Sequence, residues 1–113
     1  MKVKEIIEKL QLNALTGQKK WDTDVTGGYT SDLLSDVIAN SKEGNLWITL
    51  QTHQNTIAVA KLKDLAGIII VNNREPDEDT LKKAEEEDVP LLLSADMAFE
   101  LSGKLYDLIS SQD

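Results

Sequence analysis

The chain has 113 residues, a length that suits one compact domain with a single continuous core. Its 20 acidic and 12 basic residues give a net charge of -8, which repels nucleic-acid phosphates at long range. The absence of cysteine excludes disulfide scaffolds, thiolate zinc sites and cysteine nucleophiles. No uncharged apolar run approaches the length of a membrane span, and residues 1–10 lack the apolar stretch of a signal peptide. We therefore expect a soluble cytoplasmic protein, with residues 1–113 as one domain, that binds neither nucleic acid nor membranes.

The first third of the chain predicts two helices and two strands. Apolar residues recur at helical spacing between Lys2 and Gln11, which predicts an amphipathic helix, and the apolar stretch 12–15 predicts a short strand. Apolar and polar side chains alternate over residues 20–25, the pattern of an edge strand with one face in water. A second helix is expected around residues 33–38. We expect Ser31 or Asp32 to cap the N-terminus of this helix and Gly44 to end it.

The rest of the chain alternates buried strands with helices. Residues 46–50, 67–71 and 89–93 are nearly continuous apolar runs, as expected of strands that are covered on both faces. Helical spacing predicts helices over 55–64 and 76–88, and a last helix carries Leu101, Leu105, Leu108 and Ile109. This order predicts right-handed parallel crossovers. The fold class is therefore α/β, a three-layer α/β/α domain with a mostly parallel or mixed sheet of about five strands.

Polar residues follow each buried strand. Thr52 and His53 come after the first, Asn72, Asn73 and Arg74 after the second, and Ser94 after the third. The carboxyl ends of parallel strands meet at one edge of a sheet, where ligands collect. If the strand over residues 20–25 runs the same way, Thr26, Gly27 and Gly28 join them at that edge. This arrangement predicts a polar small-molecule site.

Each of these residues also has a structural explanation. Gly27 and Gly28 can supply positive φ in a tight turn, and Ser31, Asn55 and Ser94 are good helix caps. His53 can bond a neighbouring loop, and as the single histidine it gives no reason to expect a metal site. Arg74, the single arginine, either binds an anion or pairs with Glu75 or Asp77. We expect Trp21 and Trp47 to be core residues.

The segment Asp24-Val25-Thr26-Gly27-Gly28, with the helix predicted after it and the later strands, resembles a stand-alone DRTGG domain over nearly the whole chain. Val25 stands where the motif has arginine. That domain is similar to the N-terminal domain of HPr kinase/phosphorylase and to the N-domains of Mur ligases, and it occurs inside some phosphotransacetylases and CBS-domain pyrophosphatases. The resemblance implies an HPr kinase N-terminal-domain-like fold and a regulatory role. In the pyrophosphatases the domain accompanies adenine-nucleotide-sensing domains and contributes to subunit association.

These observations favour a non-catalytic regulatory module that binds a small anionic ligand, such as a nucleotide, and forms a homodimer. The alternative is a protein-interaction or assembly module without a small-molecule ligand. An enzyme is not expected, because the chain has one histidine, no cysteine and no G-x-x-x-x-G-K-[ST] phosphate loop. No catalytic residue, metal or cofactor is expected. The candidate ligand-binding residues are Asp24, Thr26, Gly27, Gly28, Tyr29, Thr52, His53, Asn72, Asn73, Arg74 and Ser94.

Overall fold

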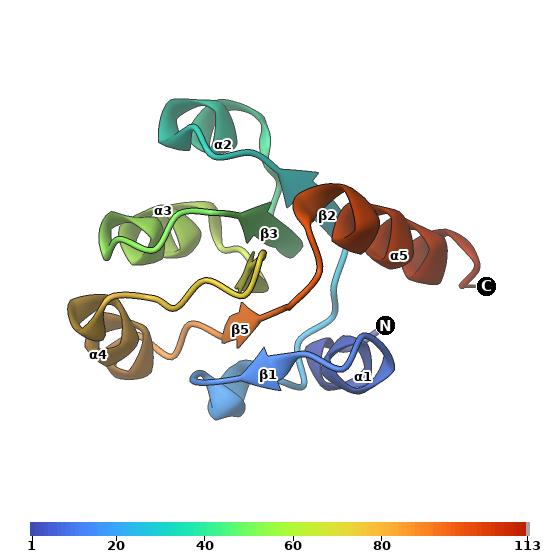
Figure 1. The fold of residues 1–113 in the computed structure, drawn as a ribbon, viewed down its shortest axis with the longest axis horizontal. Coiled ribbons are helices and arrows are strands. Elements are labelled where there is room, and N and C mark those ends of the chain that lie inside the picture. The colour runs from blue at the N-terminus through green and yellow to red at the C-terminus, as the bar shows by residue number, and fades with distance from the viewer. Residues whose placement is uncertain (113) are drawn as a thin grey trace.

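The computed structural model describes residues 1–112, which form a five-stranded mixed sheet between two layers of helices (Figure 1). The sheet order is β1-β5-β4-β3-β2, in which β2 to β5 are parallel and β1 is antiparallel to β5. The strands are β1 (Asn13–Ala14), β2 (Gly27–Thr30), β3 (Asn45–Thr49), β4 (Gly67–Ile70) and β5 (Leu91–Leu93). The helices are α1 (Val3–Lys9), α2 (Leu34–Asn40), α3 (Asn55–Lys63), α4 (Glu78–Glu86) and α5 (Ala98–Ser110). The predicted three-layer α/β/α fold is confirmed.

The central strands are apolar on both faces because helices cover both faces. Along β3, Leu46 and Ile48 belong to the core beneath α1 and α5, whereas Trp47 points into the core beneath α2, α3 and α4. The same alternation continues through Ile68 and Ile69 of β4. Trp47 is fully buried and donates its indole N–H to the Ser31 carbonyl at 2.8 Å, so its predicted core role is confirmed.

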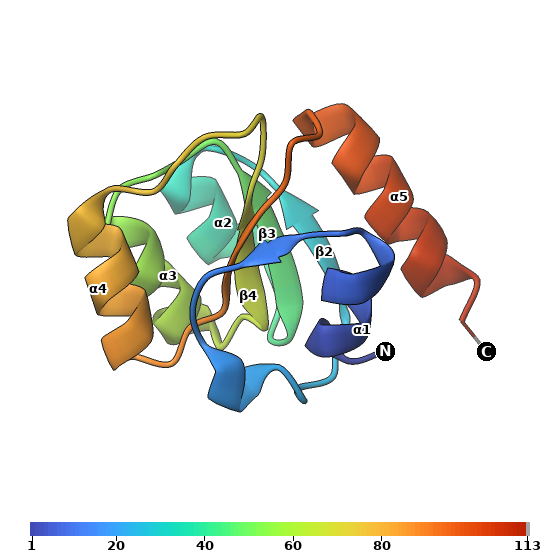
Figure 2. The same ribbon diagram turned by 60° about the horizontal axis from the view of Figure 1, so that its bottom comes forward.

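The three crossover helices lie on one face of the sheet, and the first and last helices lie on the other. Figure 1 shows α2, α3 and α4 along one side, with α1 and α5 on the opposite side near the N and C labels. Figure 2 shows α5 running beside β2 while α1 lies next to β1. The last helix therefore follows β5, next to the β1 edge, and crosses the sheet to pack against β3 and the opposite edge strand β2. No helix in residues 1–112 has both the length and the apolarity needed to cross a membrane.

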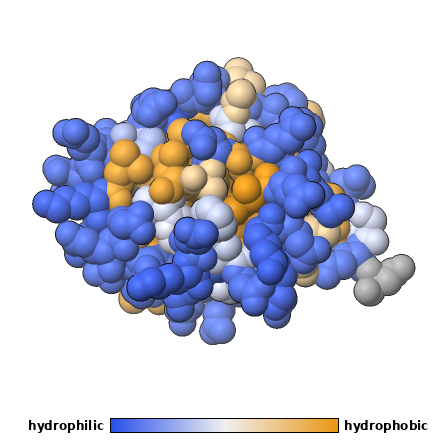
Figure 3. Space-filling model, turned by 90° about the horizontal axis from the view of Figure 1, so that it is seen from below, coloured by the Kyte–Doolittle hydropathy of each residue, from blue (hydrophilic) through white to orange (hydrophobic). Residues whose placement is uncertain are grey.

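The sheet has two edge strands, β1 and β2. Within residues 1–112, β1 pairs with β5 alone and β2 pairs with β3 alone. The view from below the molecule shows apolar surface across the middle of that face, framed by hydrophilic side chains (Figure 3). At the other end, β2 consists of the short sequence Gly-Gly-Tyr-Thr, and α5 packs against it. Short edge strands limit uncontrolled pairing with other chains.

The strand predicted over residues 20–25 is wrong. Residues Gln18–Lys20 form a 3-10 turn, and the strand of this region is β2, which starts at Gly27. The segment around residues 21–25 lies against the start of α1, where Val3 and Lys4 donate backbone N–H groups to the carbonyls of Thr23 and Trp21. The apolar alternation reflects packing, because Trp21 and Val25 both contact the core beneath α1 and α5.

The predicted end signals of α2 are also wrong. Its N-cap residue is Leu33, without a side-chain capping bond, and the Asp32 carboxylate instead accepts hydrogen bonds from Thr49 Oγ1 at 2.9 Å and Leu50 N–H at 2.7 Å. The helix ends at Asn40, before the expected stop. Gly44 has a φ of 83° and forms part of the turn into β3.

A hydrogen-bond network attaches α2 to the edge strand. The Tyr29 hydroxyl donates to Asp36 at 2.8 and 2.9 Å from its two carboxylate oxygens, and Asn40 Nδ2 donates to the same carboxylate at 2.9 Å. Hydrogen bonds from Ser31, Asn40 and Tyr29 hold the pKa of Asp36 below its ordinary value. The bond to Asp36 and burial raise the pKa of Tyr29. The charged form of Asp36 is therefore part of the native contact.

We predict that Tyr29→Phe shifts the pKa of Asp36 upward, toward its ordinary value of about 4, because one donor to the carboxylate is lost. Asp36 titrates lower in the folded chain than in the unfolded one, so its stabilising contribution is present at neutral pH and is lost as the pH falls through the folded-state pKa. The stability lost in Tyr29→Phe should accordingly shrink in acid. Carboxyl NMR titration and unfolding at two pH values measure both effects.

The matched control is Tyr106→Phe, because Tyr106 is exposed on α5. That variant should leave the pKa of Asp36 where it is. An Asp36 titration that is identical in Tyr29→Phe and in the unchanged chain would contradict the assigned network.

Two glycines should respond to alanine in opposite directions. Gly17 has a φ of 76°, and an added Cβ would lie 2.6 Å from Pro90 Cα, so Gly17→Ala should destabilise the fold by at least about 2 kcal/mol. Gly103, within α5, has no heavy atom within 4 Å of an added Cβ. Gly103→Ala should stabilise by roughly 0.5–1 kcal/mol, because alanine is the better helix former. Denaturant unfolding tests both, and equal effects would rule out the explanation.

Candidate functional site

The candidate ligand-binding residues divide between opposite ends of the parallel strands. Gly27 pairs with Asn45, the first residue of β3, so the diglycine begins its strand. Asp24 and Thr26 precede it and belong to the same end. The second group follows the carboxyl ends of β3, β4 and β5 and comprises Thr52, His53, Asn72, Asn73, Arg74 and Ser94. The expectation of one shared rim is therefore wrong, because it rested on the misplaced strand over residues 20–25.

Backbone hydrogen bonds join the loops at the carboxyl ends of β4 and β5. The chain leaves these two neighbouring strands toward opposite faces, an arrangement that commonly opens a ligand crevice. Here Asn72 N–H donates to the Asp96 carbonyl at 2.8 Å, and Asn73 N–H donates to the Ser94 carbonyl at 3.0 Å. Asn72 and Asn73 have φ angles of 61° and 56°, which asparagine adopts more readily than most residues. Both asparagines therefore have a structural reason to be present.

Thr52 and His53 connect β3 to the two helices that follow. His53 Nδ1 accepts a hydrogen bond from Asn55 N–H at 3.2 Å at the start of α3. The Thr52 carbonyl accepts from Thr80 Oγ1 at 2.7 Å and from Asp77 N–H at 3.2 Å, which attaches the loop to α4. Asn55 and Ser94, which were predicted to cap helices, do not do so. Asn55 is the first residue of α3, and Ser94 Oγ accepts a hydrogen bond from Asp96 N–H at 3.0 Å without capping a helix.

Arg74 is exposed at the carboxyl end of β4. The expected ion pair with Glu75 or Asp77 is absent: none of the four ion pairs among residues 1–112 includes Arg74. The guanidinium also lies outside the linings of both pockets described below. Anion binding by Arg74 therefore stays a prediction, without an enclosed site around it.

Asp24 and Thr26 make structural contacts at the amino end of β2. Asp24 pairs with Lys2, with Nζ and Oδ1 3.1 Å apart. Thr26 Oγ1 donates to the Glu43 carbonyl at 2.8 Å and accepts from Asn45 Nδ2 at 3.2 Å, which fastens the turn before β3. Val25, between them, is a core residue with 7% of its surface exposed. At this position the chain therefore uses an apolar side chain for packing.

Gly27 and Gly28 permit close packing inside the sheet layer. The glycines with positive φ in residues 1–112 are Gly17 and Gly44, so the tight-turn interpretation of the diglycine is wrong. A Cβ added at Gly28 would lie 2.9 Å from Leu105 Cδ2, and one added at Gly27 would lie 3.3 Å from Asn45 Nδ2. Gly28 thus lets α5 approach the strand closely.

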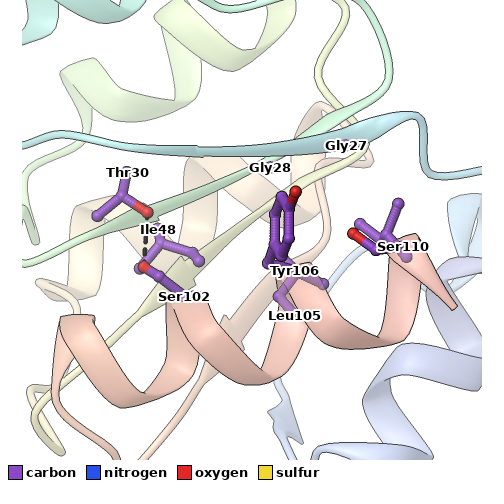
Figure 4. Close-up of a pocket in the computed structure, with 9 residues that line it drawn as sticks. Gly27, Gly28, Thr30, Ile48, Ser102, Leu105, Tyr106 and Ser110 are labelled. Atoms are coloured by element: carbon purple, nitrogen blue, oxygen red, sulfur yellow. Dashed lines mark hydrogen bonds between the residues drawn. The ribbon is translucent and has the colours of Figure 1, made fainter.

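A groove of about 320 Å³ lies between β2 and α5 and contains the diglycine backbone. Figure 4 shows Tyr106 rising from α5 toward β2, with Thr30 and Ser102 joined on one side of it and Ser110 on the other. The Thr30 and Ser102 hydroxyl oxygens are 2.7 Å apart. The groove is lined by Gly27, Gly28, Thr30, Ile48, Ser102, Leu105, Tyr106, Ile109 and Ser110. No residue of this lining carries a charge.

A second pocket, of about 470 Å³, lies at the amino ends of the parallel strands. Two lysines, Lys20 and Lys61, accompany its carboxylates, and Thr26 belongs to its lining. The carboxylates are those of Asp24, Glu43, Asp64, Glu87 and Asp88. Such a lining repels anions. Across residues 1–112, no group of three or more histidine, aspartate or glutamate side chains is placed to hold a metal ion.

The contribution of α5 to the groove was not predicted from the sequence. Ser102, Tyr106 and Ser110 are spaced four residues apart and so share one face of the helix, beside the apolar stripe that contains Leu101 and Leu105. An uncharged helix face that includes an exposed tyrosine, in a chain of net charge -8, was the available signal. Its position beside the diglycine depends on where α5 crosses the sheet, which the apolar pattern does not specify.

No model of a known protein family matches the sequence, and no curated protein matches it either. A solved structure is similar in fold: the CBS and DRTGG domains of the regulatory region of Clostridium perfringens pyrophosphatase, complexed with the activator diadenosine tetraphosphate. The TM-score is 0.67 at 11% sequence identity, and the match covers 93% of this chain and 45% of that chain. The chain therefore spans less than half of that protein's length. At this identity the likeness establishes the fold alone, and this chain has a DRTGG-like α/β fold.

Proposed function

We propose that the chain is a non-catalytic regulatory module that binds a small ligand in the groove between β2 and α5. The observation that carries the proposal is the groove itself, which combines bare diglycine backbone, three side-chain hydroxyls and an exposed tyrosine. Ligand sites commonly have this composition, with mainly apolar walls and a few polar groups that fix orientation. Its volume of about 320 Å³ falls at the small end of the range for such sites.

Nucleotides are the first ligand class to test. The solved regulatory region with a similar fold was captured with a dinucleotide activator. A regulatory role without catalysis is supported by the position of His53, which receives a hydrogen bond at the start of α3 and lies outside both pockets. Neither pocket combines a nucleophile with a histidine base.

We predict that a nucleotide at about 100 times its dissociation constant stabilises the fold by about 2.7 kcal/mol, measured as a rise in melting temperature. Ser110→Trp should abolish the rise, because Ser110 is exposed and a bulky side chain there fills the groove. Arg74→Ala should retain it, since Arg74 lies outside the groove.

The matched control is Ser35→Trp, which makes the same replacement at an exposed position of α2. That variant should melt and respond to the ligand as the unchanged chain does. A panel of adenine and uridine nucleotides that leaves the melting temperature unaltered would argue against ligand binding.

Self-association is the second candidate function, and a specific surface favours it. Phe99 and Tyr106 are 86% and 74% exposed, and they lie seven residues apart on one face of α5. The helix that carries this face packs against β2, an edge strand to which a strand of a second copy could add. Because each copy carries a net charge of -8, two copies can approach most easily where charges are absent.

We predict that the protein sediments as a dimer at micromolar concentration and that Phe99→Glu converts it to a monomer, because a buried carboxylate without a partner is costly. Leu62→Glu is the control, since Leu62 is 69% exposed on α3, away from β2 and α5. It should leave the dimer intact. A monomer in the unchanged chain would exclude the assembly function through this face.

A further inference from the structure

We propose that the groove between β2 and α5 recognises an uncharged planar heterocycle, the base portion of a nucleoside or nucleotide, and that it makes no phosphate contact. This inference rests on the proposed ligand-binding function and assigns the chemical class of the group that the groove receives. The sequence predicted a site around Arg74 that recognises an anion, whereas the group recognised in this groove is the ring.

The charge distribution excludes phosphate from both pockets. The groove between β2 and α5 has no cation in its lining, so a phosphate there would lose hydration without gaining a charged partner. The larger pocket has five carboxylates and two lysines in its lining, which gives it a net negative charge. An uncharged ring avoids both the loss of phosphate hydration and the repulsion by carboxylates. It is also unaffected by the long-range field of a chain with net charge -8.

Tyr106 provides a surface on which a planar ring can stack. Its side chain is 74% exposed and rises from α5 toward β2, opposite the bare backbone of Gly28 (Figure 4). The aromatic face is therefore accessible to a ligand without any rearrangement of the core. Base–aromatic stacking contributes about 1–3 kcal/mol per base in single-stranded nucleic-acid complexes. Leu105 and Ile48 supply apolar floor beside the ring.

Polar groups at the groove can recognise the edge of a base. Thr30 and Ser102 share one hydrogen bond at 2.7 Å, and each hydroxyl oxygen retains capacity to accept another. Ser31 N–H donates to the Ile48 carbonyl of β3 at 3.2 Å, so the alternation of the strand backbone turns the N–H and C=O of Gly28 toward the free edge. A donor and an acceptor side by side match the hydrogen-bonding edge of a nucleobase.

The experiment compares adenosine, uridine, AMP and inorganic phosphate by NMR titration of the full chain. A nucleoside should bind within about threefold of its monophosphate, and its affinity should be insensitive to ionic strength because no charge is recognised. The shifted amides should include those of Gly27 and Gly28, and inorganic phosphate should shift neither. Tyr106→Ala should weaken nucleoside binding roughly 5- to 100-fold, whereas Tyr106→Phe should retain it.

Three results overturn the inference in different ways. If AMP binds more than about tenfold tighter than adenosine and Arg74→Ala removes that advantage, phosphate is the recognised group and the proposed ligand-binding function survives. If none of the four probes shifts the groove amides, the proposed function falls together with the inference. Nucleoside affinity that is unchanged in Tyr106→Ala also overturns the ring-stacking assignment, because that variant removes the exposed aromatic surface on which the ring would stack.

Discussion

The close contact between α5 and the edge strand β2 determines much of this structure. Gly28 has no side chain on the face that Leu105 approaches, and the Cβ of any other residue would come within 2.9 Å of Leu105 Cδ2. This contact positions the last helix over β2 and β3 and buries Leu101 and Leu105 against the sheet. The groove that we assign to ligand binding exists because the helix rests directly on strand backbone. The fold and the candidate site therefore share one contact.

The DRTGG-like segment is mainly a joint between structural elements. Asp24 pairs with Lys2 before α1, Val25 enters the core, and Thr26 fastens the turn before β3. Each residue thus has a protein partner, and only the backbone of the diglycine contributes to the groove. Residues of a sequence motif can thus stabilise the fold even where the domain as a whole binds a ligand.

The apolar runs of the sequence were sufficient to predict the fold but insufficient to predict the site. Continuous burial along β3, β4 and β5 leaves a clear pattern, because helices cover both faces of these strands. β2 leaves no such pattern, since it begins with two glycines, and Gly28 contacts a helix almost eighty residues later in the chain. Without β2 in place, the direction of the diglycine was assigned wrongly, and the polar residues at the far ends of the strands were grouped with it. The periodicity of apolar residues along the sequence does not reveal long-range packing of this kind.

The paired backbone bonds from Asn72 and Asn73 have an energetic consequence for the opposite rim of the sheet. A molecule entering between those loops must first separate two amide–carbonyl contacts, at a cost of about 1 kcal/mol each, which lowers its apparent affinity by roughly thirtyfold. The backbone of the chain thus closes the position at which open α/β sheets most often bind ligands. The amide hydrogens of Asn72 and Asn73 should therefore exchange with solvent deuterium more slowly than other exposed loop amides do.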